Sequence, residues 1–546
     1  MDRKELHRRL EILREKLQKG EFKISSHLAH GFESSLKKIR IADDGLVVPE
    51  TVDGRIRSTL HAVTYFSDRQ DVKQRISLSE IQQAYFKGID QIFGESYELM
   101  VDANSDPVTF ASWYISEEER VAKTIDNLED FLNHNVQFWK NISEPTWIHL
   151  EDATTSKAVF AGEIFPAGDT RVTNSTGIYF DTTILPDPFL RLSPLKLIWD
   201  KKKLIREILK AGLYVMSYKE LALVELPRPI VAILPDRHLL EEPYKEFIDH
   251  YAYRDTLSHA NKTFGDNFQN IDEFKDFIYQ FSDANSIASA VRDPTGLLFD
   301  TDWDEDLPRQ IERYMNNSIG SNLIENVGEA IFIHFYSRFS QANDAYQRSK
   351  ELRGTPIIKA ETSWYWFNRM LQYNSRWHDK SQNEKLHVAK ALETNLSNKI
   401  SWIANVPADA LVEIRKVGAL DEIRDILGKG ISDLIEIEPN DFFQTSETVI
   451  NNLQFAFQEH EKRIKDLKTK KWKFAGKDIG SFLGVGGIEV ATAITGLPLY
   501  GALAVAAGMS GYVPTFKDLK EKLDSIRSEQ TEYKNSGIGI LLKHKE

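Results

Sequence analysis

The 546-residue sequence contains no cysteine. This absence excludes disulfides, thiolate metal sites, iron–sulfur clusters and cysteine nucleophiles, and it is typical of a reducing compartment. The sequence also lacks the patterns G-x-x-x-x-G-K-[ST], G-x-S-x-G and H-E-x-x-H. Their absence argues against a P-loop ATPase, a typical serine hydrolase and a zincin protease. No second long apolar run accompanies the one near the C-terminus, so a multi-span transporter is excluded.

The excess of acidic over basic residues disfavours a protein coated in basic surface for duplex nucleic acid, whereas a local basic patch stays open. Lys and Arg number 69 against 82 Asp and Glu, which gives a net charge of −13. We therefore expect no duplex-DNA partner. Residues 1–20 are charged throughout, carry leucines at helical spacing and contain no apolar core of a secretory signal. We expect a cytoplasmic protein, most consistent with a prokaryotic source, that can associate with the inner membrane.

The order of apolar patterns predicts an α+β fold that is predominantly α-helical and multidomain. Hydrophobic residues make up 41% and charged residues 28%, which excludes a wholly disordered chain. We expect an N-terminal helical region at 1–142, a mixed α/β unit at 143–235, a helical domain at 236–400 and a C-terminal helical region at 401–546. Strand-like runs at 146–150, 158–165, 178–180 and 227–235 define the α/β unit. Asp236, Arg237 and His238 follow the last run, at a strand end where α/β proteins often place a site.

The C-terminal region contains a Gly/Ala-rich apolar segment at 479–516. Seven basic residues precede it between Arg463 and Lys477, whereas residues 490–516 contain no charge. Val490 to Val513 covers 24 residues, and about 20 suffice to cross a bilayer. The small or helix-breaking residues that would permit close packing of such a segment in a membrane are Gly496, Pro498, Gly501, Gly508 and Gly511. The same composition also fits a helical hairpin buried in a soluble core, and both interpretations stay open.

One spacing suggests catalysis. Arg254 and His259 lie in a helical stretch with the spacing R-x4-H, which resembles the signature of HEPN-family ribonucleases. The resemblance covers six residues and implies metal-independent RNA cleavage, with His259 as general acid/base and Arg254 stabilising the charge on phosphorus. Without that chemistry, the same residues are an ordinary polar helix face.

No metal or cofactor is expected. The alternation of Asp300, Asp302 and Asp304 resembles the start of a calcium loop, but Glu305 stands where the sharp turn needs glycine and Ile311 where the loop needs glutamate. His27 and His30 share a helical face without a third ligand. We interpret the acidic stretch as a solvated turn. An aromatic group at 364–377 is expected in the core rather than as a stacking platform for nucleic acid.

Three segments together resemble poorly characterised large bacterial proteins, some of which are encoded among phage-defence genes. The segments are Gly177–Asp181 with its continuation from Leu185 to Phe189, Val406–Leu434, and Ser536–Leu542. The resemblance covers about a tenth of the chain and implies no catalytic residues, although Asp181 and Asp187 are candidates. An aspartate before proline is also a common turn device.

These observations support three hypotheses. The first is a cytoplasmic anti-phage defence component that acts through protein–protein contacts and has a membrane-inserting C-terminal segment. The second is the HEPN-like ribonuclease, the only hypothesis that has RNA as a partner. The third is a non-enzymatic scaffold or sensor subunit. We favour the first and lean towards a protein that is not an enzyme.

Overall fold

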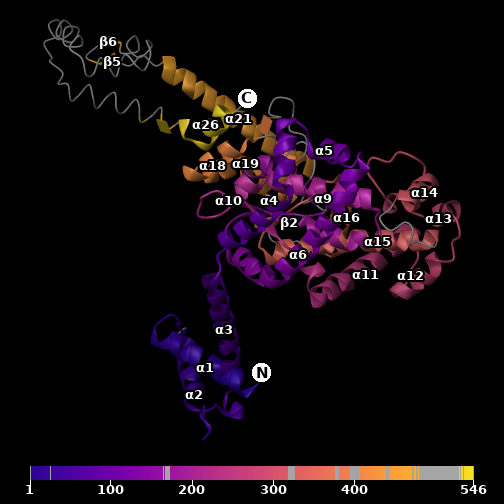
Figure 1. Ribbon diagram of the computed structural model, residues 1–546. Helices are drawn as coiled ribbons and strands as arrows, with labels where there is room; N and C mark the ends of the chain where they lie inside the picture. Colours follow the sequence, from indigo (N-terminus) through magenta and orange to yellow (C-terminus); the bar gives the residue numbers. More distant parts are fainter. Residues whose placement is uncertain are drawn as a thin grey trace. The chain divides into compact units, whose positions relative to one another are not determined.

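The computed structural model describes residues 2–24, 26–163, 165–166, 172–317, 326–374, 380–393, 402–403, 406–437, 442–469, 473–474, 477–478, 528, 531–532 and 534–544. Helices predominate around one four-stranded parallel sheet (Figure 1), which confirms the predominantly α-helical α+β class. The chain forms two compact units, 1–87 with 137–154, and 88–136 with 155–546. The fold is therefore multidomain, as expected.

The first unit is helical. Its elements are α1 (Arg3–Gln18), α2 (Ser26–Lys37), the 3-10 turn η1 (Pro49–Thr51), α3 (Gly54–Arg75), the start of α4 (Leu78–Asp102) and the end of α6 (Glu118–Asp152). The leucine stripe of residues 1–20 forms α1, which buries Leu6 and Leu13. The remaining core residues are Phe32, Val47, Val52, Ile56, Leu60 and Val63. Arg69 of α3 donates to Asp152 of α6 at 2.8 Å, which ties the last turn of α6 to this unit.

The strand expected at 146–150 is wrong. Helix α6 continues through Pro145 to Asp152. The helix survives its internal proline because Trp147, Ile148 and Leu150 are buried on it. The Thr146 hydroxyl also donates to the Ile142 carbonyl one turn earlier, at 2.7 Å. Burial of one helix face thus outweighs the local preference of the β-branched residues.

The second unit contains the sheet. Its strands are β1 (Lys157–Phe160), β2 (Thr182–Pro186), β3 (Val231–Leu234) and β4 (Thr355–Ile357), in the spatial order β3-β2-β1-β4 and all parallel. In register, Ala158 of β1 lies opposite Thr183 on one side and Thr355 on the other. All four strands are buried, which suits their apolar and β-branched residues. Strands β2 and β3 follow β1 on one side of it, and β4 lies on its other side, so the strand order reverses between β1 and β4. Open α/β sheets bind ligands at such a switch point.

Two expectations about strands need correction. Residues 178–180 form no strand, because β2 begins only at Thr182. The chain from 236 to 400 is not wholly helical, because it supplies β4. The strands expected within 158–165 and 227–235 are present as β1 and β3.

The other described elements of the second unit are mostly helices. In chain order they are α5 (Pro107–Tyr114), α7 (Val172–Thr176), α8 (Pro188–Leu192), η2 (Ser193–Leu197), α9 (Lys201–Met216), α10 (Lys219–Leu223), η3 (Arg237–Leu239), α11 (Glu242–Phe264), α12 (Ile271–Ile278), α13 (Ala284–Ala290), η4 (Pro294–Gly296), α14 (Leu307–Asn317), α15 (Val327–Glu351) and α16 (Glu361–Asn374). The C-terminal part contains α17 (Lys380–Glu393), α18 (Ala408–Lys416), α19 (Leu420–Gly428), α20 (Ile431–Ile437), α21 (Phe442–Thr469), α26 (Gly537–Lys543) and a short ladder of β5 (Lys473–Phe474) with β6 (Lys477–Asp478).

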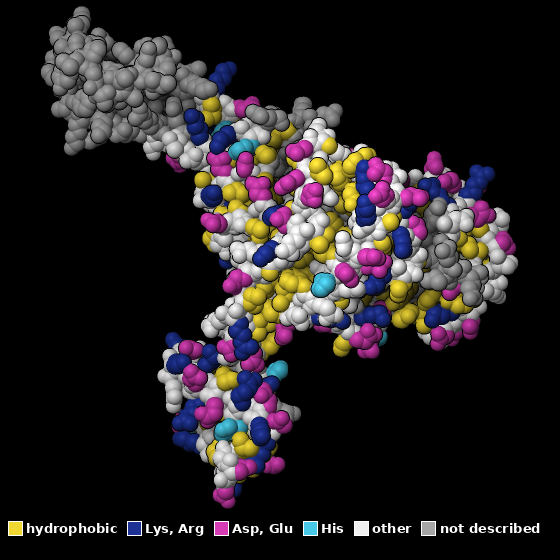
Figure 2. All heavy atoms as spheres, in the orientation of Figure 1, with side chains coloured by type: hydrophobic (Ala, Val, Ile, Leu, Met, Phe, Trp, Pro, Cys, Tyr) yellow, Lys and Arg dark blue, Asp and Glu magenta, His cyan; other side chains and the backbone are white. Residues whose placement is uncertain are grey.

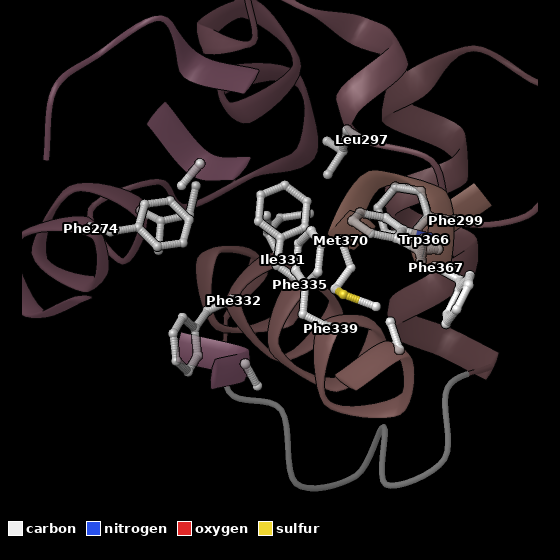
Figure 3. Close-up of a cluster of buried hydrophobic side chains, with 14 of the residues drawn as sticks. Phe274, Leu297, Phe299, Ile331, Phe332, Phe335, Phe339, Trp366, Phe367 and Met370 are labelled. Atoms are coloured by element: carbon white, nitrogen blue, oxygen red, sulfur yellow. The ribbon is translucent and has the colours of Figure 1, made fainter. Parts of the chain in front are cut away.

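An aromatic core joins α11, α12, α15 and α16. Figure 3 shows Phe274, Phe335 and Trp366 converging from three of these helices. The rings of Phe274 and Phe335 stack with centroids 6.2 Å apart. Trp364, Trp366 and Phe367 are buried, in agreement with the expectation that the aromatic group serves the core.

A second close contact joins α9 to α4. A Cβ atom added at Gly212 would lie 2.4 Å from the Phe93 ring, so the two helices approach closely only because residue 212 has no side chain. In contrast, a Cβ added at Gly88 of α4 would meet no atom within 4 Å.

Figure 2 shows hydrophobic side chains among charged ones on the visible surface.

Candidate functional site

The carboxyl edge of the sheet carries a repeated tetrapeptide. Ile-Leu-Pro-Asp ends both β2, at residues 184–187, and β3, at residues 233–236. Because the two strands are parallel neighbours, Asp187 and Asp236 lie at the same edge, and both are fully buried. Asp187 accepts the Leu190 backbone N–H at 2.7 Å and thereby caps α8. It also accepts the Asn135 side-chain amide at 3.1 Å.

The cap places an arginine against the second aspartate. Arg191, on the helix that Asp187 caps, donates through Nε to Asp236. Arg348 of α15 also contacts Asp236, and it binds Asp344 one turn earlier at 2.6 Å. Burial alone would raise the pKa of Asp344, but the Arg348 charge and His238 outweigh it and hold that pKa below its usual range. The four side chains form one buried, charge-balanced network.

His238 extends this network towards the surface. Its Nδ1 lies 3.4 Å from Asp344 Oδ1, and its side chain is 29% exposed. Burial by itself would lower the pKa of His238. The Asp344 and Asp236 carboxylates raise it by a larger amount, so the pKa lies above its usual value. At the strand end where the sequence predicts a site, Asp236 and His238 therefore contact Arg348 and Asp344, which both belong to α15. The arrangement can bind and release a proton beside fixed carboxylates.

Sequence reasoning missed the network, although one signal was present. The repeated Ile-Leu-Pro-Asp is visible without a structure and indicates two equivalent strand ends. Asp344 and Arg348 carry no such signal, because i,i+4 pairs of opposite charge are common on helices.

Arg254 and His259 are not brought together. His259 is 1% exposed, and its two ring nitrogens hydrogen-bond to the Tyr373 hydroxyl and the Gly296 carbonyl, each at 2.7 Å. Burial lowers the pKa of His259 to about 4. Arg254 is 43% exposed and bonds to Asp255 at 3.0 Å. Positions five apart on a helix point about 140° apart, which explains the separation.

The residues that the structure describes contain no group of three or more His, Asp or Glu side chains able to hold a metal ion. In the acidic turn, Asp300 accepts the backbone N–H of Asp302 at 3.0 Å and the Thr362 hydroxyl at 3.3 Å. These bonds support the interpretation as a turn. The side chain of His27 lies outside the described residues, whereas His30 is exposed.

Residues of the three segments 177–189, 406–434 and 536–542 pack together. Arg415 of α18 donates to the Gly177 and Phe180 carbonyls at 2.8 and 2.7 Å. Burial lowers the pKa of this arginine to about 10. Arg424 of α19 pairs with Asp181 at 3.0 Å and bonds to the Tyr179 carbonyl at 2.6 Å. The carbonyls of Gly177, Tyr179 and Phe180 thus accept from arginine side chains and not from a neighbouring strand, which explains why this run is not a strand.

The third segment completes this module, which we define as residues 177–189, 406–434 and 536–542. Helix α26 packs against α18, α19 and α21. Its first residue, Gly537, donates to Glu422 at 2.8 Å, and a Cβ there would lie 2.6 Å from Ile423. Ile540 and Leu541 are fully buried. Helices α21 and α26, the long helix before the apolar segment and the short one after it, are therefore parts of one packed unit.

The proposed membrane residues Gly496, Pro498, Gly501, Gly508 and Gly511 lie outside the described residues. None of the helices that the structure describes is long and apolar enough to cross a membrane.

A groove separates α4 from the α9–α10 corner. Its volume is about 640 Å³, and it is lined by Asp90, Gly94, Tyr97 and Glu98 of α4 and by Met216, Ser217, Lys219, Glu220, Leu223 and Val224. Lys219 bridges the groove to Asp90 at 2.8 Å. The volume lies within the range of about 300–1,000 Å³ that is usual for ligand pockets.

Comparisons with protein-family models, with curated proteins and with solved structures find no match.

Proposed function

We propose that the chain is a bacterial anti-phage defence component that acts through contacts with a protein partner, and that its apolar segment 479–516 enters the inner membrane. The observation that carries the proposal is the module of residues 177–189, 406–434 and 536–542. The segments that resemble defence-associated proteins form one packed element. Its helix α26 follows the apolar segment, and α21, which packs against α19 and α26, precedes it.

This anchoring constrains how the segment can enter a bilayer. Helix α26 is held by the Gly537–Glu422 bond and by the burial of Ile540, and α21 packs against α19 and α26. Both flanks therefore belong to the same folded unit. A segment that enters the membrane between them leaves on the side where it entered. The basic run from Arg463 to Lys477 favours the cytoplasmic side, where each basic residue near anionic lipid contributes about 1 kcal/mol.

The test compares the full chain with a variant in which a Gly/Ser linker of equal length replaces residues 479–516. A truncation at Asp478 is a poorer choice, because it also removes α26 from the core. We expect only the natural chain to resist carbonate extraction from membranes and to lower phage plating efficiency. Equal membrane retention and equal protection by the linker variant would refute the proposal.

The absence of cysteine allows a second test. Asp478→Cys and Ser528→Cys each introduce a single thiol on one flank. We expect an impermeant maleimide to label both from the cytoplasmic face of membrane vesicles. Labelling of the two sites from opposite faces would contradict the shared anchoring of the flanks.

A further inference from the structure

The groove between α4 and the α9–α10 corner combines apolar side chains with three carboxylates. Met216, Leu223 and Val224 lie on the α9–α10 side, and Tyr97 on the α4 side. Val101, on the next turn of α4, continues the face of Tyr97 and is 55% exposed. Apolar side chains at a concave surface are typical of sites that another chain covers.

The charges of the groove are unequal. Lys219 pairs with Asp90, so one basic and one acidic side chain neutralise each other. Glu98 and Glu220 are exposed, and neither forms an ion pair with another of the described residues. They come from opposite walls, Glu98 from α4 and Glu220 from α10. An occupant of complementary charge therefore carries basic side chains on both flanks of an apolar stripe.

We propose that this groove binds an amphipathic helix of a partner protein, with apolar residues on its buried face and Lys or Arg beside them. Both walls are helices, so the groove offers no strand edge for an extended peptide and suits the helix-in-groove mode. The net charge of −13 favours approach of a basic partner. This inference rests on the proposed function, because it names the chemistry of the partner through which the chain acts.

The probe is a synthetic 18-residue helix with Leu on one face and Lys on its flanks, and the control peptide has Glu in place of Lys. Binding to the full chain is followed by fluorescence anisotropy at low and at physiological salt. We expect the Lys helix to bind and the Glu helix not to bind. The double variant Glu98→Gln, Glu220→Gln should weaken binding about tenfold or more.

A matched control separates the groove from general charge attraction. The variant Glu242→Gln, Glu246→Gln removes the same charge from an exposed face of α11 and should bind the Lys helix as the natural chain does. Equal weakening by both double variants, or equal binding of both peptides, would overturn the inference.

Phage plating distinguishes this inference from the proposed function. If the linker replacement of 479–516 abolishes protection while the Glu98 and Glu220 variant protects fully, the proposed function stands and the groove inference fails. If Leu223→Asp abolishes protection but the Glu98 and Glu220 variant does not, the groove binds a partner that is not basic, which also refutes the inference. Loss of protection and of Lys-helix binding in both groove variants, but not in the α11 control, supports it.

Discussion

Replacing Asp236 with asparagine tests whether the buried network at the sheet edge holds the second unit together. The substitution keeps the side-chain shape and removes one negative charge. Asp236 is fully buried and contacts two arginines, of which Arg348 is 3% exposed. Arg348 keeps Asp344 as a partner, whereas Arg191 keeps the Glu163 carbonyl. Asp236→Asn therefore removes the carboxylate that contacts both arginines and takes one negative charge out of the buried network.

The expected cost is large because the charges cannot return to water without unfolding. Breaking a buried ion pair by removing one partner costs about 3–5 kcal/mol. The exposed pair of Lys202 and Glu118, 3.2 Å apart, provides the contrast. Surface pairs contribute about 0–1 kcal/mol, so Glu118→Gln should have almost no effect.

Thermal unfolding of the full chain, followed by circular dichroism, measures the difference. The sheet-containing unit, 88–136 with 155–546, has 441 residues. At an unfolding entropy of about 2.1 cal/mol/K per residue, 1 kcal/mol shifts its Tm by about 1 °C. We expect Asp236→Asn to lower the transition of the sheet-containing unit by several degrees and Glu118→Gln to leave it unchanged. Equal shifts in the two variants would refute the conclusion that the buried network stabilises the fold.

Other predictions test packing, pH dependence and the ribonuclease hypothesis. Gly212→Ala should destabilise the chain by about 1–3 kcal/mol, because the added methyl group overpacks against Phe93. Gly88→Ala should stabilise it by up to about 1 kcal/mol, because alanine has the higher helix propensity and the site has room. Tm shifts of the same sign in the two variants would contradict this. The pKa of His259 falls from 6.5 to about 4 on folding, so its contribution of about 3 kcal/mol is present above pH 6.5 and is lost between pH 6.5 and 4. His259→Gln should flatten this part of the stability profile, and an unchanged slope would show that other groups cause it. The HEPN-like hypothesis predicts RNA cleavage in EDTA that Arg254→Ala abolishes. Cleavage by that variant at the natural rate would refute the hypothesis.

Several elements could be predicted because their signal is local. The leucine spacing of residues 1–20 predicts α1, and the run before Pro235 predicts β3 together with the site-like position of Asp236 and His238. Strand β4 has only three residues, too few for an alternating pattern, and it is a strand because it pairs with β1. No local sequence pattern therefore predicts it. The interval 178–180 has strand-like residues, but the side chain of Arg415, more than two hundred positions later, donates to the Phe180 carbonyl.

The sequence by itself determined the helical class, the absence of thiol chemistry, the acidic net charge and the charge-free interval near the C-terminus, because each depends on composition or short-range periodicity. Only the tertiary structure decided which distant residues meet. It separated Arg254 from His259, joined Asp236 to Arg348 and packed α26 onto α19. The physical reason is that such contacts depend on how whole helices bury their apolar faces, and this is a property of the assembled core that no single segment encodes.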